Sequence, residues 1–215
     1  MVKSIRVIVF LVAFLSTSLV FGQSYIGVFG GLNSSRLSGD APEKASYKGL
    51  MGANVGAYLD INLGKGLSLS FQPSYSQEGT KVSYKVSGLK EPVDSLKIRL
   101  NYFSLPIFLK VTSTKERFYA LAGIETGLLT DSFISSHDKK LDIETTLSEI
   151  NVAMHFGAGF RIPVGKPRLF IELRYTQGLT NITDEPIEES YIPRVKTTGL
   201  KVLFGVELPI SNPNN

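Results

Sequence analysis

The chain of 215 residues contains no cysteine and no tryptophan, and its only histidines are His137 and His155. The absence of cysteine excludes disulfides, thiolate metal sites, cysteine nucleophiles and a lipid-modified N-terminal cysteine. Two histidines argue against a multi-histidine metal site. The formal net charge is only +4, and no run of Lys and Arg stands out. We therefore expect no nucleic-acid partner.

Long apolar runs are also absent, except near the N-terminus. Lys3 and Arg6 precede the apolar run Val7–Leu15, and small residues typical of a cleavage site follow it. This run is too short to span a bilayer comfortably. We therefore predict a cleaved signal peptide over residues 1–22 and one mature domain over residues 23–215. An uncleaved N-terminal anchor is the alternative.

The mature chain is a series of segments rich in β-branched and aromatic residues, the composition typical of strands. Most are as long as a tilted membrane strand of about 9–11 residues, and longer than the usual soluble strand of about 5–6. The predicted strands are 24–33, 50–61, 67–78, 99–111, 117–128, 150–162, 168–178 and 199–210.

The predicted connections alternate between short and long. The short turns are Asn62–Gly66, Thr112–Glu116 and Pro163–Pro167. The long connections, which are rich in turn formers and charges, are 34–49, 79–98, 129–149 and 179–198. Short turns on one side and long loops on the other are typical of outer-membrane barrels. With an even strand number, both termini then lie on the periplasmic side.

Each segment alternates an apolar face with a face that carries polar groups, charge and glycine. Over 168–178, Leu169, Ile171 and Leu173 lie on the apolar face. A soluble lipocalin-like barrel would turn this face inward, whereas a membrane barrel would turn it toward lipid. The signal peptide, the long strands and the glycine-rich polar face favour the membrane. The fold prediction is an all-β, eight-stranded antiparallel up-and-down transmembrane β-barrel of a Gram-negative outer membrane.

The segment Asn101–Lys110 reads Asn-Tyr-Phe-Ser-Leu-Pro-Ile-Phe-Leu-Lys. It resembles a conserved segment of the PorT-like outer-membrane β-barrel proteins, as do Gly-Ala-Gly-Phe-Arg at 157–161 and Phe-Ile-Glu-Leu-Arg-Tyr at 170–175. Ser104 stands where that family usually has a glutamate, so no role of that carboxylate is carried over. The resemblance implies an eight-stranded barrel in the outer membrane, but no known activity for most members.

Charged residues on the polar face are the candidate site. We interpret them as a packed ion-pair network that fills a narrow barrel. His155 should face the interior in the middle of a strand, and we interpret it as a hydrogen-bonded interior residue. The alternative is a charged constriction that selects solutes. The candidate residues are Glu125, Arg161, Glu172, Arg174, Lys201 and Glu207, with Lys110 nearby.

Enzymatic and metal-binding motifs are weak. His137 and Asp138 offer catalytic residue types, but no spacing motif organises them and there is no Gly-x-Ser-x-Gly elbow. The acidic segment 184–189 has no calcium-loop spacing, so we interpret it as a solvated loop, with divalent-ion binding as the alternative. We expect no catalytic, cofactor or metal site.

The sequence thus predicts a non-enzymatic, monomeric outer-membrane protein whose strands carry four surface loops. Its work would be envelope integrity, adhesion, or contact with a secretion or assembly partner. The expected partners are outer-membrane lipid, lipopolysaccharide, the assembly machinery and a secretion or envelope protein. A small-solute binding barrel or narrow channel is the alternative, followed by a surface lipid-modifying enzyme.

Overall fold

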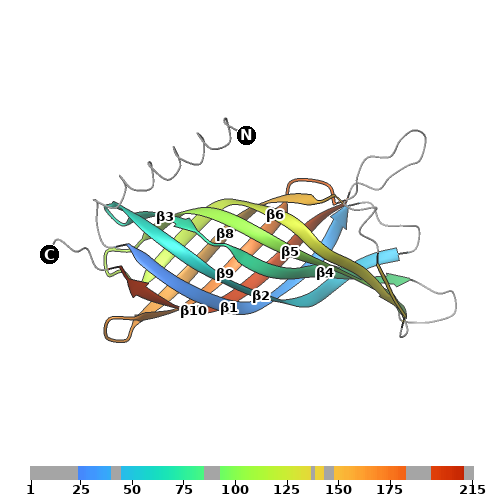
Figure 1. Cartoon of the computed structure of the whole chain (residues 1–215), viewed down its shortest axis with the longest axis horizontal. Helices are drawn as coiled ribbons and strands as arrows, with labels where there is room; N and C mark the ends of the chain where they lie inside the picture. Colours follow the sequence, from blue (N-terminus) through green and yellow to red (C-terminus); the bar gives the residue numbers. More distant parts are fainter. Residues whose placement is uncertain are drawn as a thin grey trace, which may run out of the picture.

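One antiparallel sheet that closes on itself makes up the fold (Figure 1). The computed structural model describes residues 24–39, 45–84, 93–136, 139–142, 148–182 and 195–210. The strands are β1 (Tyr25–Gly39), β2 (Ala45–Gly64), β3 (Leu67–Phe71), β4 (Ser74–Tyr84), β5 (Val93–Thr112), β6 (Phe118–Ser136), β7 (Lys139–Asp142), β8 (Ile150–Pro163), β9 (Arg168–Gly178) and β10 (Val195–Pro209).

The ring has eight members, as predicted. β1 closes it by pairing with β2 on one side and with β10 on the other. β3 and β4 together form one member, because both pair with β2 and β5 and only Gln72 and Pro73 separate them. Pro73 has no N–H to donate, which interrupts the ladder. Among the described residues, β7 pairs with β6 alone and lies outside the ring.

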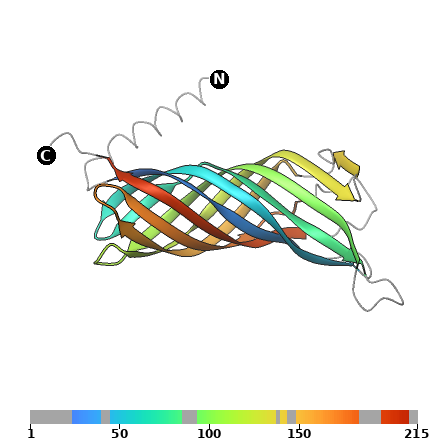
Figure 2. The same cartoon turned by 90° about the horizontal axis from the view of Figure 1, so that it is seen from below.

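The two ends of the barrel differ (Figures 1 and 2). At the turn end, β2 and β3 are joined by Lys65 and Gly66, which both have positive φ (53° and 77°). The described ends of the chain meet there, since the Ile210 N–H donates to the Ser24 carbonyl at 2.8 Å. The opposite end is the loop end, where β1 ends at Gly39, β2 begins at Ala45, β4 ends at Tyr84 and β5 begins at Val93.

Several stretches predicted as loop belong to strands, and this is a correction. In several strands, interstrand hydrogen bonding continues past the apolar part of the strand, whereas the prediction ended these strands with the apolar alternation. The affected residues are 34–39, 45–49, 79–84, 93–98, 129–136, 139–142 and 195–198. The predicted signal peptide, the His137–Asp138 pair and the acidic segment 184–189 lie outside the described residues.

The predicted alternation of faces is confirmed. In β9, Leu169, Ile171 and Leu173 are exposed on the outside of the barrel, whereas Glu172 and Arg174 are buried inside. Leu173 is 54% exposed, which suits contact with lipid and not with water. The same alternation of exposed apolar and buried side chains runs through the ring, and the buried side chains include polar and charged groups. The soluble lipocalin-like arrangement, with the apolar face inward, is therefore wrong.

Candidate functional site: the barrel interior

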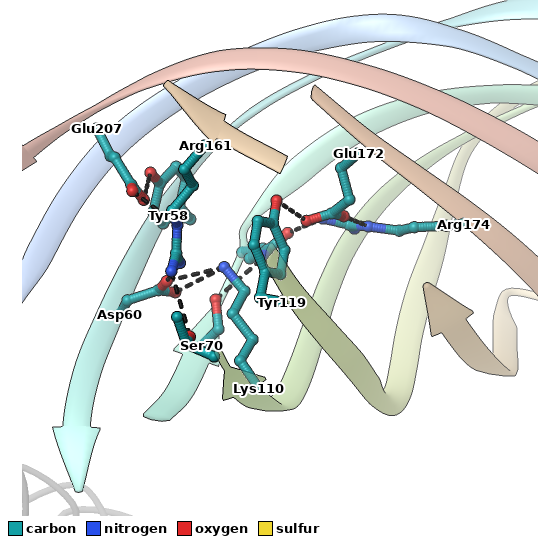
Figure 3. Close-up of polar contacts among 11 residues, drawn as sticks. Tyr58, Asp60, Ser70, Lys110, Tyr119, Arg161, Glu172, Arg174 and Glu207 are labelled. Atoms are coloured by element: carbon teal, nitrogen blue, oxygen red, sulfur yellow. Dashed lines mark hydrogen bonds and ion pairs between the residues drawn. The ribbon is translucent and has the colours of Figure 1, made fainter. Parts of the chain in front are cut away.

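Asp60 anchors the buried ion pairs nearest the turn end (Figure 3). The ammonium nitrogen of Lys110 lies 2.8 and 3.1 Å from its two carboxylate oxygens. Arg161 reaches the same carboxylate from β8, with Nη2 3.4 Å from Oδ2. Asp60 and Lys110 are each only 3% exposed at the side chain. Buried charges of this kind persist in proteins when they are paired, as they are here.

Arg161 links this pair to β10 (Figure 3). Its Nε lies 2.8 Å from Oε1 of Glu207, and the Tyr58 hydroxyl donates to the other Glu207 oxygen at 2.6 Å. The guanidinium also lies over the Tyr119 ring, 4.4 Å from its centroid. These contacts use one face of the guanidinium and two of its nitrogens, a geometry that lysine could not reproduce.

Tyr119 continues the network toward β9. Its hydroxyl donates to Glu172 at 2.7 Å, and Glu172 also accepts from Arg174. Arg174 in turn donates to the side-chain oxygen of Gln72 across the barrel. The large Tyr119 ring fits because Gly159 faces it: a Cβ at that position would lie 2.2 Å from the ring.

A second network lies in the middle of the barrel. Glu125 lies 3.2 Å from Nε2 of His155 and 3.5 Å from the Lys201 ammonium. Lys201 also pairs with Glu78 at 3.2 Å. On its other side, Nδ1 of His155 lies 3.0 Å from the Thr176 hydroxyl. Each charged group here therefore has an opposite or hydrogen-bonding neighbour.

Apolar side chains fill the interior at the loop end. Leu100 is fully buried (0% exposed) and packs with residues from β1, β5, β10 and the segment after β9. The sequence did not predict this cluster, because Leu37, Ile182 and Val195 lie in segments that were predicted as loops. Its buried members are Leu37, Leu100, Tyr102, Ile182 and Val195.

All six predicted charged residues, and Lys110, lie inside the barrel, divided between the two networks. The prediction omitted four of their partners: Tyr58, Asp60, Glu78 and Tyr119. Tyr58 and Asp60 stand on the polar face of the second predicted strand, so the alternation itself could have included them.

The family of the chain follows from a comparison of its sequence. A family profile described as "Outer membrane protein beta-barrel domain" matches residues 16–184, which is more than half of the chain. The chain belongs to this family. It is thus an integral β-barrel protein of the Gram-negative outer membrane, and its exposed apolar ring faces lipid. A comparison with curated proteins found no match.

Several solved outer-membrane proteins have a similar structure. The attachment invasion locus protein Ail of Yersinia pestis is 15% identical, with a TM-score of 0.43 over 87% of this chain and 100% of that chain. Neisserial surface protein A is 12% identical, with a TM-score of 0.49 over 85% and 96%. OprG of Pseudomonas aeruginosa is 12% identical, with a TM-score of 0.46 over 89% and 97%.

The interior of this outer-membrane barrel contains one arrangement of catalytic residue types. Thr176, His155 and Glu125 form a hydroxyl–imidazole–carboxylate chain, the residue types of a catalytic triad. His155 is 0% exposed, so it does not contact solvent in the described part of the chain. Within the described residues, no group of three or more His, Asp and Glu side chains could hold a metal ion, and no helix is long and apolar enough to cross a membrane.

The turn end of the barrel is hollowed. A cavity of about 440 Å³ lies there, with Asp60 and Arg161 among its lining residues. Nearer its rim, Arg168 pairs with Glu116 at 3.1 Å and covers the Tyr25 ring at 4.0 Å. The remaining lining is mostly hydroxyl and amide groups. Asp60 and Arg161, which line the inner end of this cavity, also belong to the interior ion-pair network described above.

Proposed function

We propose that this outer-membrane protein is a non-enzymatic scaffold that presents its loop end at the cell surface, with both termini in the periplasm. Its work is envelope integrity, adhesion, or contact with a secretion or assembly partner. The observation that carries the proposal is the filled interior. From the turn end to the loop end, the interior is occupied by two ion-pair networks and then by the apolar cluster around Leu100. This leaves the loop end for specific contacts.

The same packing disfavours a channel. An eight-stranded barrel has an interior only wide enough for its own side chains. Within the described part of the chain, the turn-end cavity extends inward to Asp60 and Arg161. Its lining does not include Glu125, His155 or Lys201 of the middle network. Solutes would have to displace paired charges and then apolar side chains, so transport through this interior is unfavourable. Membership of the PorT-like subfamily remains a prediction.

Shortening the loop-end connections tests the scaffold proposal. Variants with residues 85–92 or 183–194 replaced by short Gly/Ser linkers should still assemble, because these segments lie between strands. Heat-modifiable migration on gels reports assembly. Barrier function against a bulky antibiotic, or adhesion, should be lost. Lys166→Gln in a turn-end connection is the control and should keep both. Normal function in both loop variants would refute the proposal.

A small-solute binding barrel is the second candidate, and the turn-end cavity favours it. Its volume of about 440 Å³ falls within the range of small-molecule sites, and Arg168 offers a cation at its rim. Isothermal titration of the micellar protein with a panel of small periplasmic anions would test it. An anion that binds the wild type but not Arg168→Gln would support this function. If no anion of the panel binds, these anions are excluded as ligands.

A further inference from the structure

Three lysines face one another across neighbouring strands near the loop end. Lys48 of β2 is opposite Lys81 of β4, and Lys81 is opposite Lys97 of β5. Residues in register on an antiparallel sheet share a face, with Cβ atoms about 4.5–5.5 Å apart. The row is on the outside, because the sequence neighbours Tyr47 and Ile98 pack against the interior apolar cluster.

Other positive charge lies beside the row. Arg99 follows on the outer face of β5, opposite Gly79 of β4, and the exposed Arg36 lies on β1. Like charges in direct register destabilise a sheet. Within the described residues, no ion pair joins Lys81 or Lys97 to an acidic side chain. The arrangement therefore favours an anion bound from outside the protein.

The height of the row on the barrel indicates where that anion comes from. Tyr75 and Phe103 are opposite each other at the loop-side edge of the apolar ring. From Tyr75 to Lys81 the strand rises about 20 Å, or about 15 Å along the barrel axis at a tilt of about 40°. Lysine stems can bend back toward the membrane. The ammonium groups thus reach the headgroup layer, not the hydrocarbon.

We propose that Lys81 and Lys97, with Lys48 and Arg99 at the edges, bind phosphate groups of an outer-leaflet glycolipid, the phosphorylated lipid A part of lipopolysaccharide. The inference deepens the proposed function, because it relies on the loop end facing outward. Phosphate suits the site since it carries enough negative charge to offset several lysines, and lipid attachment holds it at this height. Such a contact would fix the barrel among outer-leaflet lipids.

Lipid A retention by the purified full-length protein tests the site. Micellar protein is titrated with bisphosphorylated lipid A and with dephosphorylated lipid A, and bound lipid is counted by native mass spectrometry. The wild type should prefer the bisphosphorylated form. Lys81→Gln with Lys97→Gln should weaken that binding by about tenfold or more, since each lysine near an anionic surface contributes about fivefold.

The matched control is Lys115→Gln with Lys166→Gln, which removes the same charge at the turn end, outside the lining of the turn-end cavity, and should leave binding unchanged. Equal binding of both lipids, or equal weakening by both double variants, would overturn the site. Displacement of lipid A by millimolar inorganic phosphate would reduce it to a site for free anions and overturn the lipid assignment. Micelles expose both ends of the barrel, so this result is independent of orientation. Protease access to the loops on intact cells tests orientation separately.

Discussion

The buried pair between Asp60 and Lys110 gives the sharpest prediction on stability. Both side chains are 3% exposed, and the contacts are 2.8 and 3.1 Å. Asp60→Asn would leave the Lys110 ammonium beside the rings of Tyr58 and Tyr119 with no carboxylate. Breaking one side of a buried pair typically costs about 3–5 kcal/mol. Lys110→Met should cost less, because Asp60 keeps Arg161 at 3.4 Å.

The double variant, Asp60→Asn with Lys110→Met, leaves Arg161 with Glu207 and removes the isolated charge. Its cost should fall below the sum of the single costs by about 2–3 kcal/mol, the coupling expected for residues in direct contact. Urea titration of refolded protein in micelles, followed by the heat-modifiable gel shift, measures all three free energies. Strictly additive costs, or a cost below about 1 kcal/mol for Asp60→Asn, would refute a dry, paired interior.

Three further predictions concern packing, lipid contact and permeation. Gly159→Ala should lower the free energy of unfolding by about 1–3 kcal/mol in the same titration, because its Cβ would overlap the Tyr119 ring; an unchanged midpoint would contradict that packing. Leu173→Arg, in the middle of the outer face of β9, should cost about 2–4 kcal/mol, and Ser38→Arg near the loop end about 1 or less. Equal costs would mean that lipid does not contact Leu173. Planar bilayer recordings should show no steady open state, and a stable conductance would contradict the filled interior.

The fold was predictable because its signal is local. Alternate residues such as Leu169, Ile171 and Leu173 identify a strand with one apolar face, and the short turns indicate antiparallel neighbours. The polar face also marked which charges point inward, including Glu172 and Arg174. These inferences need no knowledge of how distant strands align.

The pairing inside the barrel was not predictable, because it depends on how the ring closes. Tyr58 and Glu207 are 149 residues apart in the chain, and their contact follows from the registers of β2, β1 and β10 together. The apolar cluster was missed for another reason. Leu37, Ile182 and Val195 lie in the segments 34–49 and 179–198. Both segments were predicted as long connections, so neither face was assigned to these residues.

The relation between the apolar face, lipid and the filled interior is tested most directly by NMR of the protein in lipid nanodiscs. A spin label on the lipid chains should broaden the methyl signals of Ile171 and Leu173. A water-soluble paramagnetic complex should leave the side-chain signals of Arg174 and His155 sharp. Apolar methyls unaffected by the lipid label, or interior signals broadened from the aqueous side, would contradict a lipid-facing apolar ring around a filled barrel.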